Sequence, residues 1–260
     1  MKFGIMQGRL TNQPKHILSK YPKNWENEFR FLIDTDLDYI ELITEEKLNL
    51  KNPIWSKKGQ EKVLKKLNYQ KIKHTILCDN YILNHSLRST KTKNYYKKLF
   101  NALPKISCKK IIVPIKILKI KKDYVNLKNF LNFLNSINKN KILIVLELNT
   151  LNKKILLMIK NLKNIGITFD TGNLFLYDKK FYKKIFKFKN EIKHIHLKDR
   201  DKFGNNVPIG EGLVNFEALI KYLKKIKYNN TLTFESHRGS DAILTAKKNT
   251  IYMKNILKNV

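Results

Sequence analysis

The sequence predicts a single-domain α/β fold, a (β/α)8 TIM barrel that spans residues 1–260. Short β-branched or apolar runs alternate with longer lysine-rich stretches whose apolar residues recur at helical spacing. The count of eight such pairs and the length of 260 residues both suit this barrel. A doubly wound sheet would usually have fewer strands and a glycine-rich turn after the first strand, which MQGRL (6–10) matches poorly.

The expected elements follow one another without a Gly/Ser- or Pro-rich linker, so no domain boundary is predicted. The expected strands are 3–8, 38–43, 71–78, 109–115, 141–148, 165–170, 193–199 and 231–236. Clear helical patterns include 24–33 and 215–226. Asn215 and Asp241 stand where an N-cap belongs, just before a helical run.

The composition excludes several classes of protein. With 42% hydrophobic residues the chain can build a core, so it is not a disordered polyelectrolyte despite a net charge of +32. Only five of the 53 basic residues are arginine, the residue that nucleic-acid readers favour, and the lysines are spread over all the expected helices. This favours the codon bias of an AT-rich genome as the origin of the charge, with a functional polyanion-binding surface as the alternative.

A cytoplasmic location is expected. The apolar runs stop short of the roughly 18–20 residues that a membrane span needs. The start of the chain lacks the apolar stretch and cleavage site of a signal peptide. Cys78 and Cys108 form neither a disulfide framework nor a metal-finger spacing.

Four consecutive expected strands each carry a potential metal ligand at or near the carboxyl end, where TIM barrels place their active sites. These residues are Glu147, Asp170, His196 and Glu235. Converging carboxylates without a cation would repel one another, and a divalent cation removes that conflict. Three carboxylates and one imidazole suit Mn2+, Mg2+ or Co2+, and Zn2+ is also compatible.

The same segments resemble a known family. The motifs that carry the resemblance are MQGRL, DYIELI, FDTGN, HIHLKDRD, PIGEG (208–212) and TFES. In this order and spacing they resemble the sugar phosphate isomerase/epimerase group of xylose-isomerase-like barrels, over essentially the whole chain. The segment from FDTGN through VPIGEGLVNF is most similar to L-ribulose-5-phosphate 3-epimerases.

The resemblance implies a divalent-metal-dependent epimerase or isomerase that acts on a ketose or ketose phosphate. It implies that Glu147, Asp170, His196 and Glu235 bind one metal ion, with Mn2+ in first place and Mg2+, Co2+ or Zn2+ as alternatives. It also implies that Glu147 and Glu235 act as the acid and base, one on each face of the substrate, which suits the removal and return of a proton beside a ketone.

Substrate contacts are expected at further positions near the strand ends. Asn173 stands where many relatives carry a histidine, a change shared by phosphopentulose epimerases, whereas MQGRL is not typical of those enzymes. The other expected contacts are Lys198, Arg200, Glu41, His237 and Arg238. The last two follow the eighth expected strand, near the place where barrels often bind phosphate.

Two alternatives stay open. One is a non-catalytic barrel that binds a sugar or a partner protein. The other is a DNA-repair endonuclease of the same superfamily, whose three-zinc cluster uses several additional histidines. This chain has six histidines in all, and Asn173 stands at one of the relevant positions. The expected partner is a small-molecule sugar or sugar phosphate, with no membrane and no nucleic acid beyond non-specific charge attraction. Homo-oligomerisation stays open.

Overall fold

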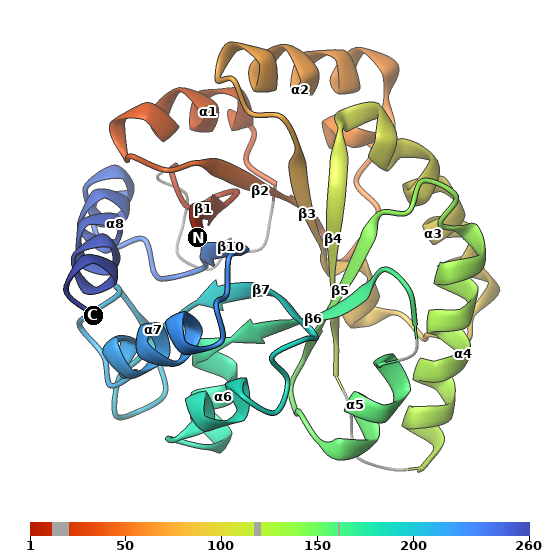
Figure 1. Cartoon of the computed structure of the whole chain (residues 1–260). Coiled ribbons are helices and arrows are strands. Elements are labelled where there is room, and N and C mark those ends of the chain that lie inside the picture. The colour runs from red at the N-terminus through yellow and green to blue at the C-terminus, as the bar shows by residue number, and fades with distance from the viewer. Residues whose placement is uncertain (12–20, 117–120, 161) are drawn as a thin grey trace. The chain divides into compact units, whose positions relative to one another are not determined.

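The strands form a closed barrel in the order β1-β10-β7-β6-β5-β4-β3-β2, which confirms the predicted TIM barrel (Figure 1). The computed structural model describes residues 1–11, 21–116, 121–160 and 162–260. The barrel strands are β1 (Lys2–Met6), β2 (Tyr39–Thr44), β3 (Thr75–Asp79), β4 (Cys108–Ile115), β5 (Leu143–Leu148), β6 (Ile165–Asp170), β7 (Ile192–Leu197) and β10 (Thr231–Phe234). Each coincides with a predicted run to within a few residues.

Helices follow the strands around the fold. The α-helices are α1 (Trp25–Asp34), α2 (Lys57–Tyr69), α3 (Thr90–Ala102), α4 (Lys121–Ile137), α5 (Lys153–Ile159), α6 (Thr171–Tyr177), α7 (Phe216–Lys225) and α8 (Ala242–Asn259). Short 3-10 helices are η2 (Pro53–Trp55), η3 (Asn80–Asn84), η4 (Leu103–Ile106) and η5 (Phe181–Ile185). Both predicted N-caps are confirmed: Asn215 accepts a hydrogen bond from the amide of Ala218 at 2.8 Å, and Asp241 from that of Leu244 at 2.9 Å.

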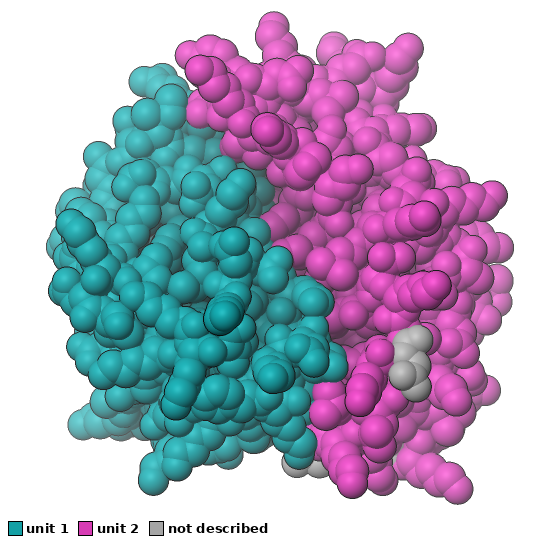
Figure 2. All heavy atoms as spheres, viewed as in Figure 1, with its two compact units in different colours: residues 1–18, 22–41, 168–260 teal, residues 19–21, 42–167 magenta. Residues whose placement is uncertain are grey.

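The chain divides into two compact units (Figure 2). The first comprises residues 1–18, 22–41 and 168–260. In it β1 pairs in parallel with β10, and β10 with β7. Phe3 of β1 and Phe234 of β10 stack with ring centroids 5.9 Å apart, and the buried faces of α1, α7 and α8 add further apolar side chains to this core.

The second unit comprises residues 19–21 and 42–167. Its centre is the parallel pairing of β4 with β3 and with β5. Helices α3 and α4 pack together through Tyr96 and Phe130, whose ring centroids are 5.1 Å apart in an edge-to-face contact. Both rings are buried.

One element of the fold was not predicted from the sequence. A two-residue antiparallel pair, β8 (Asp199–Arg200) with β9 (Asn206–Val207), follows β7. It is too short to leave a hydrophobic pattern in the sequence.

Within the described residues, no helix combines the length and the apolar character that crossing a membrane requires.

Candidate metal centre

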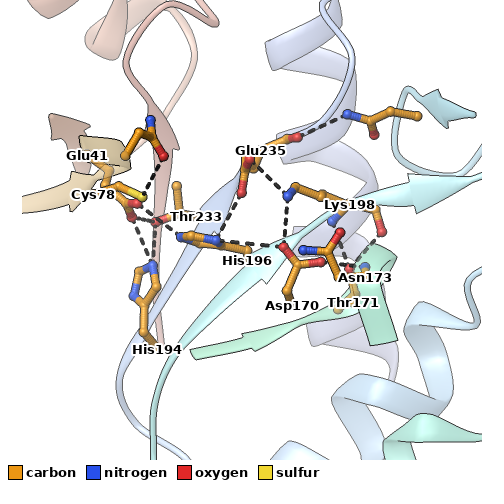
Figure 3. A network of polar contacts seen from close by, with 12 residues as sticks. Glu41, Cys78, Asp170, Thr171, Asn173, His194, His196, Lys198, Thr233 and Glu235 are labelled. Atoms are coloured by element: carbon orange, nitrogen blue, oxygen red, sulfur yellow. Dashed lines mark hydrogen bonds and ion pairs between the residues drawn. The ribbon is translucent and has the colours of Figure 1, made fainter. Parts of the chain in front are cut away.

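Asp170 is the last residue of β6 and the N-cap of α6, and its two carboxylate oxygens have different partners. Oδ1 caps α6 by accepting a hydrogen bond from the amide of Asn173 at 2.6 Å. Oδ2 lies 2.9 Å from the Lys198 ammonium and 3.8 Å from Nδ1 of His196. A strand-end aspartate in this chain is therefore both a helix cap and a member of a buried polar cluster (Figure 3).

His196 lies on β7, directly opposite Thr233 of β10 in the parallel register. Its imidazole is fully buried and is held from both sides. Nδ1 is 2.9 Å from Oε2 of Glu235, and Nε2 is 3.0 Å from Oε1 of Glu41. The ring is therefore fixed with one nitrogen toward Asp170 and Glu235 and the other toward Glu41 (Figure 3).

Glu235 follows β10, and its amide donates a hydrogen bond to the carbonyl of Leu197 on β7 at 3.0 Å. Its Oε1 is 2.9 Å from the Lys198 ammonium, so this lysine bridges Glu235 and Asp170. Burial raises the pKa of Glu235, but the charges of Lys198 and His196 outweigh burial and hold the pKa well below its ordinary value. Glu235 is therefore an ionised carboxylate at neutral pH.

Glu41, at the centre of β2, anchors the far side of His196. Its carboxylate is fully buried and accepts hydrogen bonds from His194 at 2.9 Å and from the hydroxyl of Thr233 at 2.6 Å, besides His196. Burial raises the pKa of Glu41, yet the two histidines together lower it well below its ordinary value. A carboxylate on the outer nitrogen of a histidine is the usual way to orient a metal-binding imidazole.

A glycine makes room for the outer part of this network. Gly4 of β1 lies in register with Tyr39 of β2 on one side and with Thr233 of β10 on the other. The Tyr39 hydroxyl reaches across β1 to Thr233 at 2.8 Å, and a Cβ on Gly4 would lie 2.3 Å from the Tyr39 ring. Only glycine at position 4 allows β2 and β10 to share this contact over the strand between them.

Comparisons with known proteins decide the family. The model of the xylose isomerase-like TIM barrel family matches residues 29–256. The chain belongs to that family. Among curated proteins it is similar to the uncharacterized proteins MJ1311 (33% identical over 84 residues) and MJ1614 (39% over 70 residues) of Methanocaldococcus jannaschii. These matches cover 31% and 26% of this chain, and 29% and 27% of the two relatives.

Solved structures of similar fold include sugar epimerases. D-psicose 3-epimerase from Clostridium cellulolyticum H10, solved with D-tagatose, has a TM-score of 0.75 at 14% identity and covers 99% of each chain. D-allulose 3-epimerase from Methylomonas sp., in complex with D-allulose, has a TM-score of 0.75 at 16% identity over 98% of this chain and 96% of that one. L-ribulose 3-epimerase has a TM-score of 0.75 at 13% identity over 99% and 95%. At these identities the likeness shows the fold.

Three of the four predicted metal ligands lie in the first compact unit of this xylose isomerase-like barrel. Asp170, His196 and Glu235 offer two carboxylate oxygens and an imidazole nitrogen that lie within 4.8 Å of one another. This donor set fits a divalent cation, and the Lys198 ammonium between the two carboxylates shows that the cluster attracts positive charge. The fourth predicted ligand, Glu147, is half-buried near the end of β5, opposite Pro114 of β4.

The structure assigns definite contacts to the predicted substrate-binding residues. Arg200 donates to the side-chain oxygen of Asn173 at 3.3 Å and to the carbonyl of Gly204 at 3.1 Å. His237 accepts from the amide of Gly239 at 2.9 Å. Lys198 contacts both carboxylates, and Glu41 bonds to the histidines, as described above.

Arg238 is also buried, and two of its hydrogen bonds go to backbone carbonyls. It donates to the carbonyls of Gly8 at 3.2 Å and Thr11 at 3.1 Å, so it holds the loop after β1.

Sequence reasoning missed several members of the cluster. His194 lies two residues before His196, on the same face of β7, and Thr233 lies opposite His196 on β10. The two-residue spacing places both histidines on one face, but neither His194 nor Thr233 was assigned to the site. Arg9 was missed as well, although it follows the first strand and arginine is rare in this chain. Its Nη2 is 3.9 Å from Oε1 of Glu235.

Proposed function

We propose that this chain is a divalent-metal-dependent epimerase or isomerase of a ketose or ketose phosphate. The observation that carries the proposal is the buried group of Asp170, His196 and Glu235, whose ligand atoms lie within 4.8 Å of one another. The family and the sugar epimerases of similar fold support the same chemistry.

The proposed metal ligands are Asp170, His196, Glu235 and Glu147. In this role His196 uses Nδ1, since Nε2 is held by Glu41 at 3.0 Å. Asp170 uses Oδ2, because Oδ1 caps α6. When bound, a divalent cation would polarise the ketone of the substrate and stabilise the negative charge of an enediolate. The expected ion is Mn2+, with Mg2+, Co2+ and Zn2+ as alternatives.

Glu147 and Glu235 are the proposed acid and base. A carboxylate must be ionised to take a proton from the carbon beside the ketone, and the charge of Lys198, which lowers the pKa of Glu235, supports that state. The Lys198 ammonium, 2.9 Å from Glu235, fixes this carboxylate in position. Epimerisation requires a second carboxylate to return the proton on the opposite face, which is the proposed role of Glu147.

The experiment that tests the proposal is deuterium incorporation from solvent. Purified protein loaded with Mn2+ is incubated in D2O with a panel of ketoses and ketose phosphates, and the exchanged carbon is located by NMR. We expect deuterium at one carbon next to the ketone of at least one sugar, and its loss in the Asp170→Ala/His196→Ala variant. A metal-loaded protein that binds a sugar but exchanges no proton would overturn the proposal in favour of a non-catalytic barrel.

A further inference from the structure

Three aromatic rings of the second compact unit form a continuous stack. The rings of Tyr81 and Tyr95 are parallel to within 7°, with centroids 3.7 Å apart, and those of Tyr81 and His85 to within 8°, with centroids 3.8 Å apart. Two rings this close to a third cannot share one of its faces, so Tyr81 lies between the other two. The stack therefore ends at the imidazole of His85, whose inner face is covered by Tyr81.

The fold holds the inner end of this stack in the core. Tyr95 and Tyr81 are buried, and the Tyr95 hydroxyl donates a hydrogen bond to Asp79 at 2.7 Å. Trp55 and Tyr96 contact the Tyr95 ring edge-to-face, with ring centroids 5.4 and 5.5 Å away. Burial and these contacts account for the two tyrosines as members of the core.

His85 is different, because it is only half-buried and is nevertheless held in one orientation. Its Nδ1 is 2.7 Å from the carbonyl oxygen of Tyr81. A carbonyl oxygen only accepts, so Nδ1 carries a proton and donates it to this bond. The bond and the stacking together fix the plane of the ring, although burial in the core does not require an imidazole here. The outer face of His85 is therefore a flat surface that is oriented in advance.

A cavity of about 190 Å3 lies beside this end of the stack. Its lining includes His85, the aliphatic side chains of Leu83 and Leu87, and the polar side chains of Ser86 and Asn126. The lining segments follow β3 and β4, which pair in parallel, so the sheet brings them to the same edge. Since the inner face of the imidazole is covered, the cavity has its outer face available. Leu83 is 47% exposed and offers apolar surface for a ligand to cover.

The size, charge and polarity of the cavity indicate the class of ligand. Pockets for drug-sized ligands have roughly 300–1,000 Å3, so a cavity of about 190 Å3 suits a single ring system. Lys116 and Asp123 both line the cavity, and their opposite charges favour a neutral ligand. A sugar carries hydroxyls around its ring, which Leu83 and Leu87 would leave unpaired. A flat ring instead stacks on His85 and presents only its edge to polar groups.

We propose that this cavity binds a heteroaromatic ring of the nucleobase type, stacked on the outer face of His85 with the amide of Asn126 at its polar edge. Histidine is among the aromatic side chains on which bases stack. An amide offers both a donor and an acceptor, which suits the mixed edge of a base. The proposal goes beyond the proposed function, since neither residue is among the proposed metal ligands or acid/base groups.

The test adds adenosine to the full chain and follows binding by calorimetry and by proton NMR. Adenosine should shift the ring-proton signal of His85 upfield, because a stacked purine shields it, and the signal is identified by its absence in His85→Ala. His85→Ala should weaken adenosine binding by about tenfold or more, the scale of a lost stacking ring, whereas His85→Phe keeps a ring in the stack and should retain most of the binding. His74→Ala, which removes an exposed histidine just before β3, is the matched control and should equal wild type.

Asn126→Ala gives a second measurement, because this residue lies on α4, outside the stack. It should weaken adenosine binding by about threefold or more, the scale of a lost hydrogen bond, and it decides the question if His85→Ala does not fold. Adenosine monophosphate distinguishes the source of the ring: tighter binding than adenosine supports a nucleotide, and equal binding supports a nucleoside. No binding of adenosine, or binding that both alanine variants leave unchanged, would overturn the proposal. Displacement of adenosine by D-fructose would overturn it in favour of a sugar pocket. The epimerase is judged separately by deuterium exchange.

Discussion

Each compact unit buries carboxylates where a strand ends, and the two units satisfy them differently. In the second unit Asp79, the last residue of β3, is fully buried and accepts hydrogen bonds from three neutral hydroxyls. These belong to Thr44 at 2.6 Å, Tyr95 at 2.7 Å and Tyr96 at 2.6 Å. In the first unit Asp170 and Glu235 instead face Lys198 and His196.

The difference shows which property makes a buried carboxylate useful to a metal. Burial raises the pKa of Asp79, and its neutral donors do not overcome that effect. Burial also raises the pKa of Glu235, but the positive charge of Lys198 reverses the sign. A carboxylate surrounded by hydroxyl donors has its oxygens committed to the fold, whereas one that faces cations is ready to exchange one cation for another.

The largest expected effect tests this distinction through metal binding. We predict that wild-type protein binds about one divalent ion per chain, because one such cluster offers one site. The Asp170→Ala/His196→Ala variant should lose high-affinity binding, and Asp79→Asn should keep it. Metal content after dialysis and calorimetry with Mn2+ provide the measurement. Stoichiometric metal in the double variant would refute the site.

The next effect is on catalysis and sharpens the roles of the two proposed acid/base residues. Glu147→Gln and Glu235→Gln keep the shape of the side chain and one oxygen but remove the base. Each should lower net epimerisation by roughly 100-fold or more, the scale of a lost general base. At least one variant should still exchange a substrate C–H proton with D2O from a single epimer. Near wild-type rates in both would show that neither residue transfers the proton.

Part of this site could be predicted from the sequence and part could not, for a physical reason. Asp170, His196 and Glu235 stand at the ends of apolar runs, and parallel strands carry such residues to one rim. Asp79 follows the run TILC in the same way as Asp170 follows ITF, so the local pattern does not separate a metal ligand from a structural acid. Only the identity of the donors does, and these come from distant parts of the chain.

The supporting residues show the same limit. Glu28 lies within a helix whose apolar pattern the sequence predicts, and nothing local marks it as the acceptor for the loop after β1. Gly4 could be assigned to a strand from the sequence. The need for glycine at this position, however, comes from Tyr39 and Thr233, which the register places on either side of it. Gly4 and Tyr39 are 35 residues apart in the sequence, and Tyr39 and Thr233 are more than 190 apart. A short stretch of sequence contains no information about such pairs.

A smaller effect concerns Glu28, which is intermediate between the two regions because it combines neutral amide donors with the nearby charge of Arg9. Its pKa in the folded protein is about 7, against 4.5 for the ordinary group. The unfolded chain therefore releases this proton at lower pH than the folded protein does. Stability present below about pH 4.5 is lost as the pH rises to about 7, by about 2–3 kcal/mol.

Comparison with Glu28→Gln isolates this contribution, since glutamine does not titrate and all other groups, Asp79 among them, cancel in the difference. Urea unfolding at pH 5 and pH 8 gives the free energy of unfolding of both proteins. The wild type should lose stability relative to the variant between these values. Parallel pH profiles would mean that Glu28 ionises in the folded protein at its ordinary pKa.

The smallest expected effect tests how much one hydroxyl donor contributes to the stability of the buried Asp79 carboxylate. Tyr96→Phe removes the donor to Oδ2 but keeps the buried ring and its edge-to-face contact with Phe130. We expect a loss of about 1–2 kcal/mol in the free energy of unfolding, the scale of a buried hydrogen bond to a charged group. Tyr69→Phe, at an exposed position of α2, is the matched control and should cost almost nothing.

The loss in Tyr96→Phe should be larger at pH 8 than at pH 4, because the hydroxyl stabilises the ionised carboxylate and a protonated Asp79 needs it less. A loss that is the same at both pH values would mean that the hydroxyl serves packing, and that Asp79 does not depend on this neutral donor for its charge.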